Sequence, residues 1–165
     1  MSDWNFAAVW DGIAAIVPDR DAVVCGDGRV TWAAFADRAS RLAWYLRTEA
    51  GLEPGDRVAI DITNRPEYLE TFYAALKLGC VPVNVNFRYT AGELHYLLEN
   101  SDAKALVHDP AFAEVAAQAT ALVDDGRRPL LLEVGAPYEH ALAASAPAAE
   151  WTARPPDLLK TVACP

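Results

Sequence analysis

The sequence predicts an α/β fold: an open, doubly wound, mostly parallel sheet with helices on both faces, plus an N-terminal helix and a β-hairpin. Three observations support this prediction. Short apolar runs alternate with segments of helical periodicity through residues 57–144. The connections between these segments are short, as in right-handed strand–helix–strand crossovers. The expected strands are continuous apolar runs rather than strict alternations, which is typical of strands covered on both faces.

The first third of the chain predicts two helices joined by a hairpin. Residues 5–16 place apolar side chains at helical spacing. Two β-like runs then flank residues 26–28 (Gly-Asp-Gly), which favour a hairpin turn. The spacing of these glycines matches neither the dinucleotide nor the Walker fingerprint, so we interpret them as a turn and not as a phosphate loop. Thr31 can cap the next helix, which we expect to continue to about Ala50.

The remainder alternates between strands and helices. Strands are expected at residues 57–62, 81–85, 103–108 and 129–134. Helices are expected at residues 66–78, from the capping-box sequence at residues 90–93 to residue 99, at 110–123 and at 137–144. We therefore assign residues 1–145 to one α/β layer. The Ala/Pro-rich segment 146–165 is expected to be a linker followed by the start of a further strand at Asp157.

Composition and charge exclude several classes of function. The formal net charge is -9, which disfavours binding to nucleic acid. The longest apolar runs are too short to span a bilayer, and the N-terminus lacks the basic region of a signal peptide. The three cysteines form no CxxC pair, which argues against a zinc site. Together these features indicate a cytoplasmic protein with no transmembrane segment.

No residue stands out as a catalytic group or a metal ligand. His95, His108 and His140 have no Ser or Cys partner at a nucleophile-elbow spacing, so we interpret them as surface or capping residues. The pair at residues 124–125 (Asp-Asp) offers too few carboxylates for a metal site. Asn64 and Asn86 each follow an expected strand, and we interpret them as turn formers. Asp56 and Arg57 stand at the start of the first expected strand, where we interpret them as the support of a turn.

Five sequence segments, in this order and spacing, resemble the adenylate-forming acyl-CoA synthetases, a family that includes fatty-acyl-CoA synthetases, coumarate-CoA ligases and luciferases. Each segment is similar to a family motif, and together they cover most of the chain. The Asn-Phe-Arg-Tyr-Thr form of the last segment is most similar to bacterial fatty-acyl-type members. The segments are VTWAAF (30–35), the apolar stripe of the following helix, GLEPGDRVAI (51–60), NRPEY (64–68) and AALKLGCVPVNVNFRYT (74–90).

The resemblance implies a two-step reaction with ATP, Mg²⁺ and CoA. A carboxylate attacks the α-phosphate of Mg-ATP and displaces pyrophosphate, which gives an acyl-adenylate. The thiol of CoA then attacks the acyl carbon of this intermediate and releases AMP. The substrate would be a fatty acid or another carboxylic acid. The resemblance also implies that Arg88 contacts the CoA phosphates. The alternative is a loop arginine that pairs with Glu93 or with backbone carbonyls.

The family's catalytic groups lie in motifs that these 165 residues do not contain. No glycine-rich phosphate loop occurs anywhere among the nine glycines, and no motif for the catalytic lysine is present. We therefore expect an incomplete part of a larger adenylation domain, an N-terminal fragment of a synthetase that is inactive alone and binds no cofactor itself. Two alternatives remain open: a subunit of a split synthetase whose partner chain carries the remainder, and a stand-alone acyl-, CoA- or protein-binding module.

Overall fold

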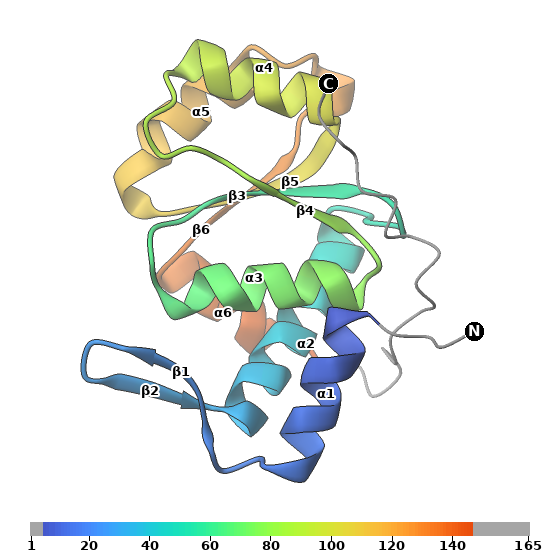
Figure 1. Cartoon of the computed structure of the whole chain (residues 1–165). Helices are drawn as coiled ribbons and strands as arrows, with labels where there is room; N and C mark the ends of the chain where they lie inside the picture. The colour runs from blue at the N-terminus through green and yellow to red at the C-terminus, as the bar shows by residue number, and fades with distance from the viewer. Residues whose placement is uncertain (1–4, 147–165) are drawn as a thin grey trace.

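A four-stranded parallel sheet forms the centre of the protein. The computed structural model describes residues 5–146, so most of the segment predicted as a linker and strand start lies outside the described residues. The strand order is β4-β3-β5-β6, and all three pairings are parallel (Figure 1). The strands are β3 (Arg57–Asp61), β4 (Val81–Asn84), β5 (Ala103–His108) and β6 (Leu130–Glu133).

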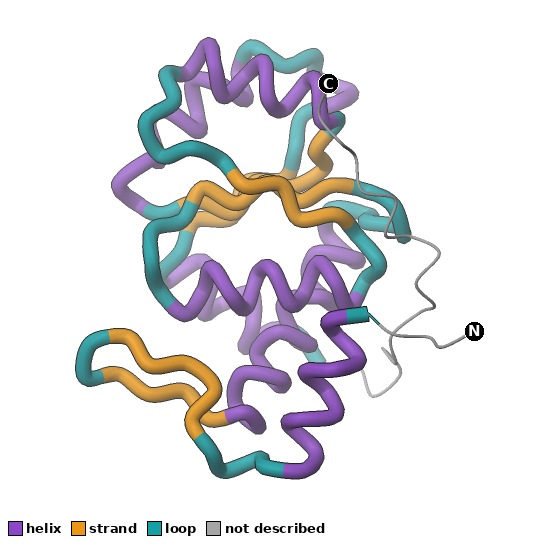
Figure 2. Tube along the Cα trace, in the orientation of Figure 1, coloured by secondary structure: helices purple, strands orange, loops and turns teal. Residues whose placement is uncertain are grey.

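Helices cover both faces of this sheet, which confirms the predicted doubly wound α/β architecture. Figure 2 shows the sheet as a middle layer between two layers of helices. One face is covered by α3 (Pro66–Lys77) and α6 (Ala136–Ala144), with α2 (Trp32–Glu49) packed against them; the other is covered by α4 (Ala91–Ser101) and α5 (Ala113–Ala121).

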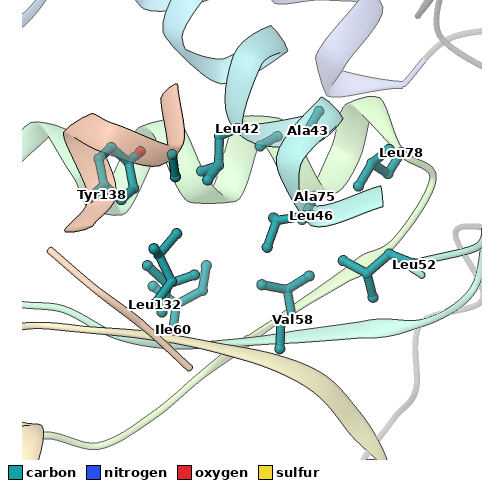
Figure 3. Packing of buried hydrophobic residues seen from close by; sticks show 14 of the residues in the cluster. Leu42, Ala43, Leu46, Leu52, Val58, Ile60, Ala75, Leu78, Leu132 and Tyr138 are labelled. Carbon is teal, nitrogen blue, oxygen red and sulfur yellow. The ribbon is translucent and has the colours of Figure 1, made fainter. Parts of the chain in front are cut away.

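The larger hydrophobic core lies between the sheet and the layer of α2, α3 and α6. Leu42 and Leu46 of α2 point toward Val58 and Ile60 of β3, and Tyr138 of α6 closes one end of the cluster (Figure 3). All five side chains are almost fully buried. Burial of apolar side chains on this scale is the main force that holds a sheet and its helices together.

The N-terminal helix and hairpin pack outside this core. The helix α1 (Phe6–Ile16) contacts α2 and α3 through an aromatic cluster in which Trp10 meets Phe35 and Tyr73. The hairpin of β1 (Asp21–Cys25) and β2 (Gly28–Thr31) is antiparallel, and its turn uses Gly26 at a φ of 58°. A positive φ there suits glycine, because it has no side chain to clash with the backbone. Both predicted elements are confirmed.

Local capping explains where several helices begin. The side chains of Asn5, Thr31 and Thr90 each accept a backbone N–H in the first turn of α1, α2 and α4, and Thr90 with Glu93 completes a capping box. No helix within residues 5–146 is long and apolar enough to cross a membrane.

The helix predicted at residues 110–123 is the one clear error in the element assignment. It begins as a 3₁₀ turn, η1 (Pro110–Phe112), and continues as α5 only from Ala113. Phe112 has φ −109° and ψ 7°, outside the α-helical region, so the two segments are not one helix. A second 3₁₀ turn, η2 (Asp125–Arg127), follows α5.

Candidate functional site

The topology places a candidate site at the carboxyl ends of the strands. The chain leaves β3 toward β4 in one direction, then crosses back over β3 to add β5 on its other side. Ligands of open α/β sheets bind in the crevice at such a reversal point, outside the carboxyl ends of the strands. We call residues 61–65, 85–90 and 108–109 the carboxyl edge; they are the last residues of β3 and β5 and the segments that follow β3, β4 and β5.

Arg88 lies on this edge, in the loop after β4, and is exposed. Its backbone N–H donates to Asn86 Oδ1 at 3.1 Å, and Tyr89 N–H donates to the Asn86 carbonyl at 2.9 Å. These bonds confirm Asn86 as a turn former and fix the loop. The guanidinium of Arg88 stacks on the neighbouring Phe87 ring, 5.2 Å from its centroid. The side chain therefore stands in solvent at a defined place, where it can donate to an anion.

Glu93, the alternative partner considered for Arg88, is hydrogen-bonded to Thr90 instead. Both the backbone N–H and the hydroxyl of Thr90 donate to Glu93 Oε2 at 2.8 Å. These bonds lower the pKa of Glu93. Among the described residues, no carboxylate lies within ion-pair distance of Arg88.

A second cluster on the carboxyl edge centres on Asp109, which follows β5. Its Oδ2 accepts from the Thr63 hydroxyl at 2.8 Å and from Arg65 at 3.3 Å, and its Oδ1 accepts from Ala111 N–H at 3.2 Å. The pKa of Asp109 is lowered because these donors outweigh the opposing effect of burial. The cluster ties the loop after β3 to the loop after β5.

Asp61 and His108, the last residues of β3 and β5, lie side by side beneath these loops. They are register partners, and their exposed fractions are only 3% and 4%. Burial raises the pKa of Asp61, the positive charge that His108 can carry opposes this, and the charge of Asp109 reinforces it. The interpretation of His108 as a surface or capping residue is therefore wrong, because the end of β5 is covered by surrounding structure.

Asp56 and Arg57 make structural contacts, and two of the histidines lie on helices. At the opposite edge of the sheet, Asp56 accepts from Lys104 at 2.9 Å, and Arg57 pairs with Asp102 at 3.0 Å. His95 lies 3.4 Å from Glu99 on the same helix. His140 is exposed on α6.

Asn64 lies in the loop after β3, where its backbone carbonyl accepts from the Cys25 thiol at 3.6 Å. The tip of the hairpin therefore touches the carboxyl edge. No group of three His, Cys, Asp or Glu side chains suited to a metal ion occurs between residues 5 and 146.

Sequence reasoning missed the Asp61 and Asp109 clusters. The available signal was an aspartate near the end of each of two expected strands: Asp61 is the penultimate residue of 57–62, and Asp109 directly follows 103–108. A charged side chain at the end of a buried strand is uncommon, so it predicts either a hydrogen-bond network or a functional site.

Comparison with known proteins identifies the family. A sequence model described as AMP-binding enzyme matches residues 11–163. The chain belongs to the AMP-binding enzyme family. It is 38% identical over 136 residues to the medium/long-chain-fatty-acid–CoA/3-oxocholest-4-en-26-oate–CoA ligase of Mycobacterium tuberculosis (strain ATCC 25618 / H37Rv), a match covering 82% of this chain and 25% of the relative. It is 36% identical over 163 residues to the 3-oxocholest-4-en-26-oate–CoA ligase of Rhodococcus rhodochrous, covering 93% of this chain and 29% of the relative.

Solved structures of AMP-binding enzymes share the fold. The N-terminal domain of FACL13 from Mycobacterium tuberculosis superposes with a TM-score of 0.78 at 30% identity, covering 87% of this chain and 37% of that structure. A benzoate CoA ligase from Burkholderia xenovorans LB400 superposes with a TM-score of 0.80 at 26% identity, covering 93% of this chain and 30% of that structure. The chain thus spans 25% to 37% of the length of these relatives.

Proposed function

We propose that this chain is the N-terminal α/β layer of an acyl-CoA synthetase, which converts a carboxylic acid, ATP and CoA to acyl-CoA, AMP and pyrophosphate. The supporting observation is the match of an AMP-binding sequence model to residues 11–163, together with superposition on the N-terminal domain of FACL13. The substrate acid belongs to the fatty-acid or steroid-acid class, because the similar curated ligases are named for such acids.

In this function the chain contributes binding and scaffolding. ATP with Mg²⁺ activates the carboxylate, and the thiol of CoA accepts the acyl group. Arg88 is the residue we assign to CoA, as a donor to its phosphates. The assignment is supported by its exposed guanidinium, its fixed loop and its position at the carboxyl ends of the strands.

The 165-residue polypeptide alone is expected to be catalytically silent. Its sequence holds no glycine-rich loop to surround a triphosphate with backbone N–H groups. We expect no ATP–pyrophosphate exchange above background when the purified polypeptide is incubated with fatty acids of several chain lengths, with a complete relative as the positive control. Acid-dependent exchange by the polypeptide would contradict this expectation and leave the family assignment intact. Exchange that appears only with a separately expressed second chain would favour a split synthetase.

The role of Arg88 is tested in an active synthetase that contains this segment. Arg88→Gln is expected to raise the KM for CoA about tenfold, because one charge-assisted hydrogen bond contributes roughly 1.5 kcal/mol or more. The first half-reaction, measured as ATP–pyrophosphate exchange, is expected to stay within about twofold of wild type, since CoA takes no part in it.

Arg127→Gln is the matched control for Arg88. Arg127 is also an exposed arginine, but it pairs with Asp102 at the amino end of β5, at the opposite edge of the sheet. An unchanged KM for CoA in Arg88→Gln, or an equal increase in both variants, would refute the assignment of Arg88 to CoA.

A further inference from the structure

Three ionisable side chains end three neighbouring strands at one level. The parallel register pairs Asp61 of β3 with His108 of β5, and His108 with Glu133 of β6. Register partners on neighbouring strands point to the same face of a sheet. A carboxylate, an imidazole and a second carboxylate therefore form one row across the carboxyl ends of β3, β5 and β6.

The alternation of side chains fixes the face on which this row lies. Ile60, Val107 and Leu132 precede the three residues and all belong to the core beneath α2, α3 and α6. Since successive residues of a strand point to opposite faces, the row points to the face of α4 and α5. These helices face the sheet with uncharged side chains, namely Leu94, Leu98, Ala116, Ala119 and Thr120.

The remaining ionisable groups around Asp61 can be named. From β5 and the segment after it come His108 and Asp109, and Asp109 is itself paired with Arg65. From β6 comes Glu133, which is half-buried at the outer end of the row. Tyr89, in the loop before α4, packs against the core on this face. Among residues 5–146, His108 is the group whose positive charge acts on Asp61, although their charged atoms do not come within ion-pair distance.

One atom in this row has no hydrogen-bond partner. Asp61 Oδ1 is completely shielded from solvent and accepts no hydrogen bond from any described residue. A buried carboxylate oxygen without a donor is costly, so something must compensate it. The neighbouring ring has one nitrogen already engaged, because His108 Nδ1 lies 3.1 Å from the Asp109 carbonyl oxygen. A carbonyl only accepts, so Nδ1 carries a hydrogen, and the other nitrogen, Nε2, is the atom that can gain a proton.

We propose that Asp61 and His108 form a proton-sensitive latch between the carboxyl ends of β3 and β5. The pair can carry one proton more than an ionised Asp61 carboxylate and a neutral His108 ring. That proton lies either on Asp61, as a carboxylic acid, or on His108, as an imidazolium beside the carboxylate. Both states avoid an uncompensated buried charge. When that proton leaves, the carboxylate is buried beside a neutral ring, and the two strand ends separate more readily.

The direction of the pH effect follows from Asp61. Its pKa is higher in the folded protein than in the unfolded chain, so the folded state retains the proton to higher pH. The stabilising contribution is therefore present at low pH and is lost as pH rises through the folded pKa. Asp109 acts in the opposite direction: its lowered pKa adds stability at neutral pH that is lost under acid conditions.

Amide hydrogen exchange of the 165-residue chain tests the latch at two backbone groups beside it. Asp109 N–H donates to the Asp61 carbonyl at 2.8 Å, and Val134 N–H donates to the His108 carbonyl at 2.9 Å. With rates corrected for intrinsic exchange, Asp61→Asn is expected to slow exchange of both amides about tenfold near pH 8, because the substitution removes a carboxylate charge that is buried without a hydrogen-bond donor. At acid pH, once Asp61 is protonated in the wild type, the same substitution is expected to change the rates by less than about twofold.

Asp109→Asn is the matched control. It removes a carboxylate from the same edge, but one that is fully hydrogen-bonded, and is expected to speed exchange near pH 8. The Asp61 carboxyl carbon, followed by NMR across the pH range, supplies a second measurement. We expect His108→Gln to move the titration of the Asp61 carboxyl group to higher pH. Exchange in Asp61→Asn that is equal to wild type or faster both near pH 8 and at acid pH would overturn the latch, as would an unmoved Asp61 titration in His108→Gln.

Discussion

Arg38→Met is expected to lower the free energy of unfolding by about 3 kcal/mol or more, the cost of leaving a buried charge without its partner. The charge is that of Glu70 on α3, whose exposed fraction is 1%. Glu70 Oε1 accepts from Arg38 Nε at 2.7 Å, and Oε2 accepts from the Tyr138 hydroxyl at 2.9 Å. Methionine retains much of the arginine stem but supplies no donor. Urea unfolding at neutral pH measures the difference.

The same arginine also connects a third helix. Its terminal nitrogens donate to both oxygens of Glu139 on α6 at 2.6 and 2.9 Å, and the guanidinium lies 5.9 Å from the centre of the Tyr138 ring. The hydrogen bond to Glu139 is the main reason that the pKa of Arg38 is raised, and the same bond lowers the pKa of Glu139. Arg38 therefore joins α2 to α3 and α6 on one face of the sheet.

A double-mutant cycle separates the pair from the general effect of losing an arginine. Arg38→Met with Glu70→Met is expected to be more stable than Arg38→Met alone, because a buried ion pair replaced by apolar side chains is often neutral. Arg29→Met is the control: its pair with Asp21 is exposed, so we expect a loss of less than about 1 kcal/mol. Equal losses in Arg38→Met and Arg29→Met would show that Glu70 does not depend on Arg38.

The order and type of the elements could be predicted because their signals are local. Capping side chains at Thr31 and Thr90 and the glycine turn at residue 26 act within a few residues, so the sequence contains all that fixes them. The doubly wound sheet followed from alternating periodicity. The 3₁₀ turn at residues 110–112 was missed because a helical pattern does not distinguish it from a first helical turn.

The site could be predicted only in part, for a physical reason. Arg88 follows a strand, so its place on the carboxyl edge is implied by chain order. The row of Asp61, His108 and Glu133 depends instead on the strand order β3-β5-β6 and on the register, and neither is encoded near those residues. Glu70 is a similar case: a helical glutamate is normally exposed, and only contacts from α2 and α6 bury it.

The second large effect is expected on stability, at the contact between α1 and α3. Asp11→Ala is expected to cost about 3 kcal/mol, because it removes the carboxylate that neutralises a buried ammonium. That ammonium belongs to Lys77 of α3, whose side chain is 4% exposed and is hydrogen-bonded to Asp11. The Tyr73 hydroxyl donates to the same carboxylate, and Lys77 Nζ also lies 4.5 Å from the centre of the Tyr73 ring. Without Asp11, a cation–π contact of about 1–2 kcal/mol is the main remaining compensation.

Lys77→Met tests the same pair from its other side and should behave differently. It removes the buried charge itself, and the Asp11 side chain that remains is 34% exposed and still accepts from Tyr73. We therefore expect Lys77→Met to stay within about 1 kcal/mol of wild type. Hydrogen exchange of the α1 amides locates the effect: Asp11→Ala should speed exchange there far more than in β5, since α1 lies outside the main core. Equal costs for the two substitutions would mean that packing alone, and not the buried charge, holds α1 on α3.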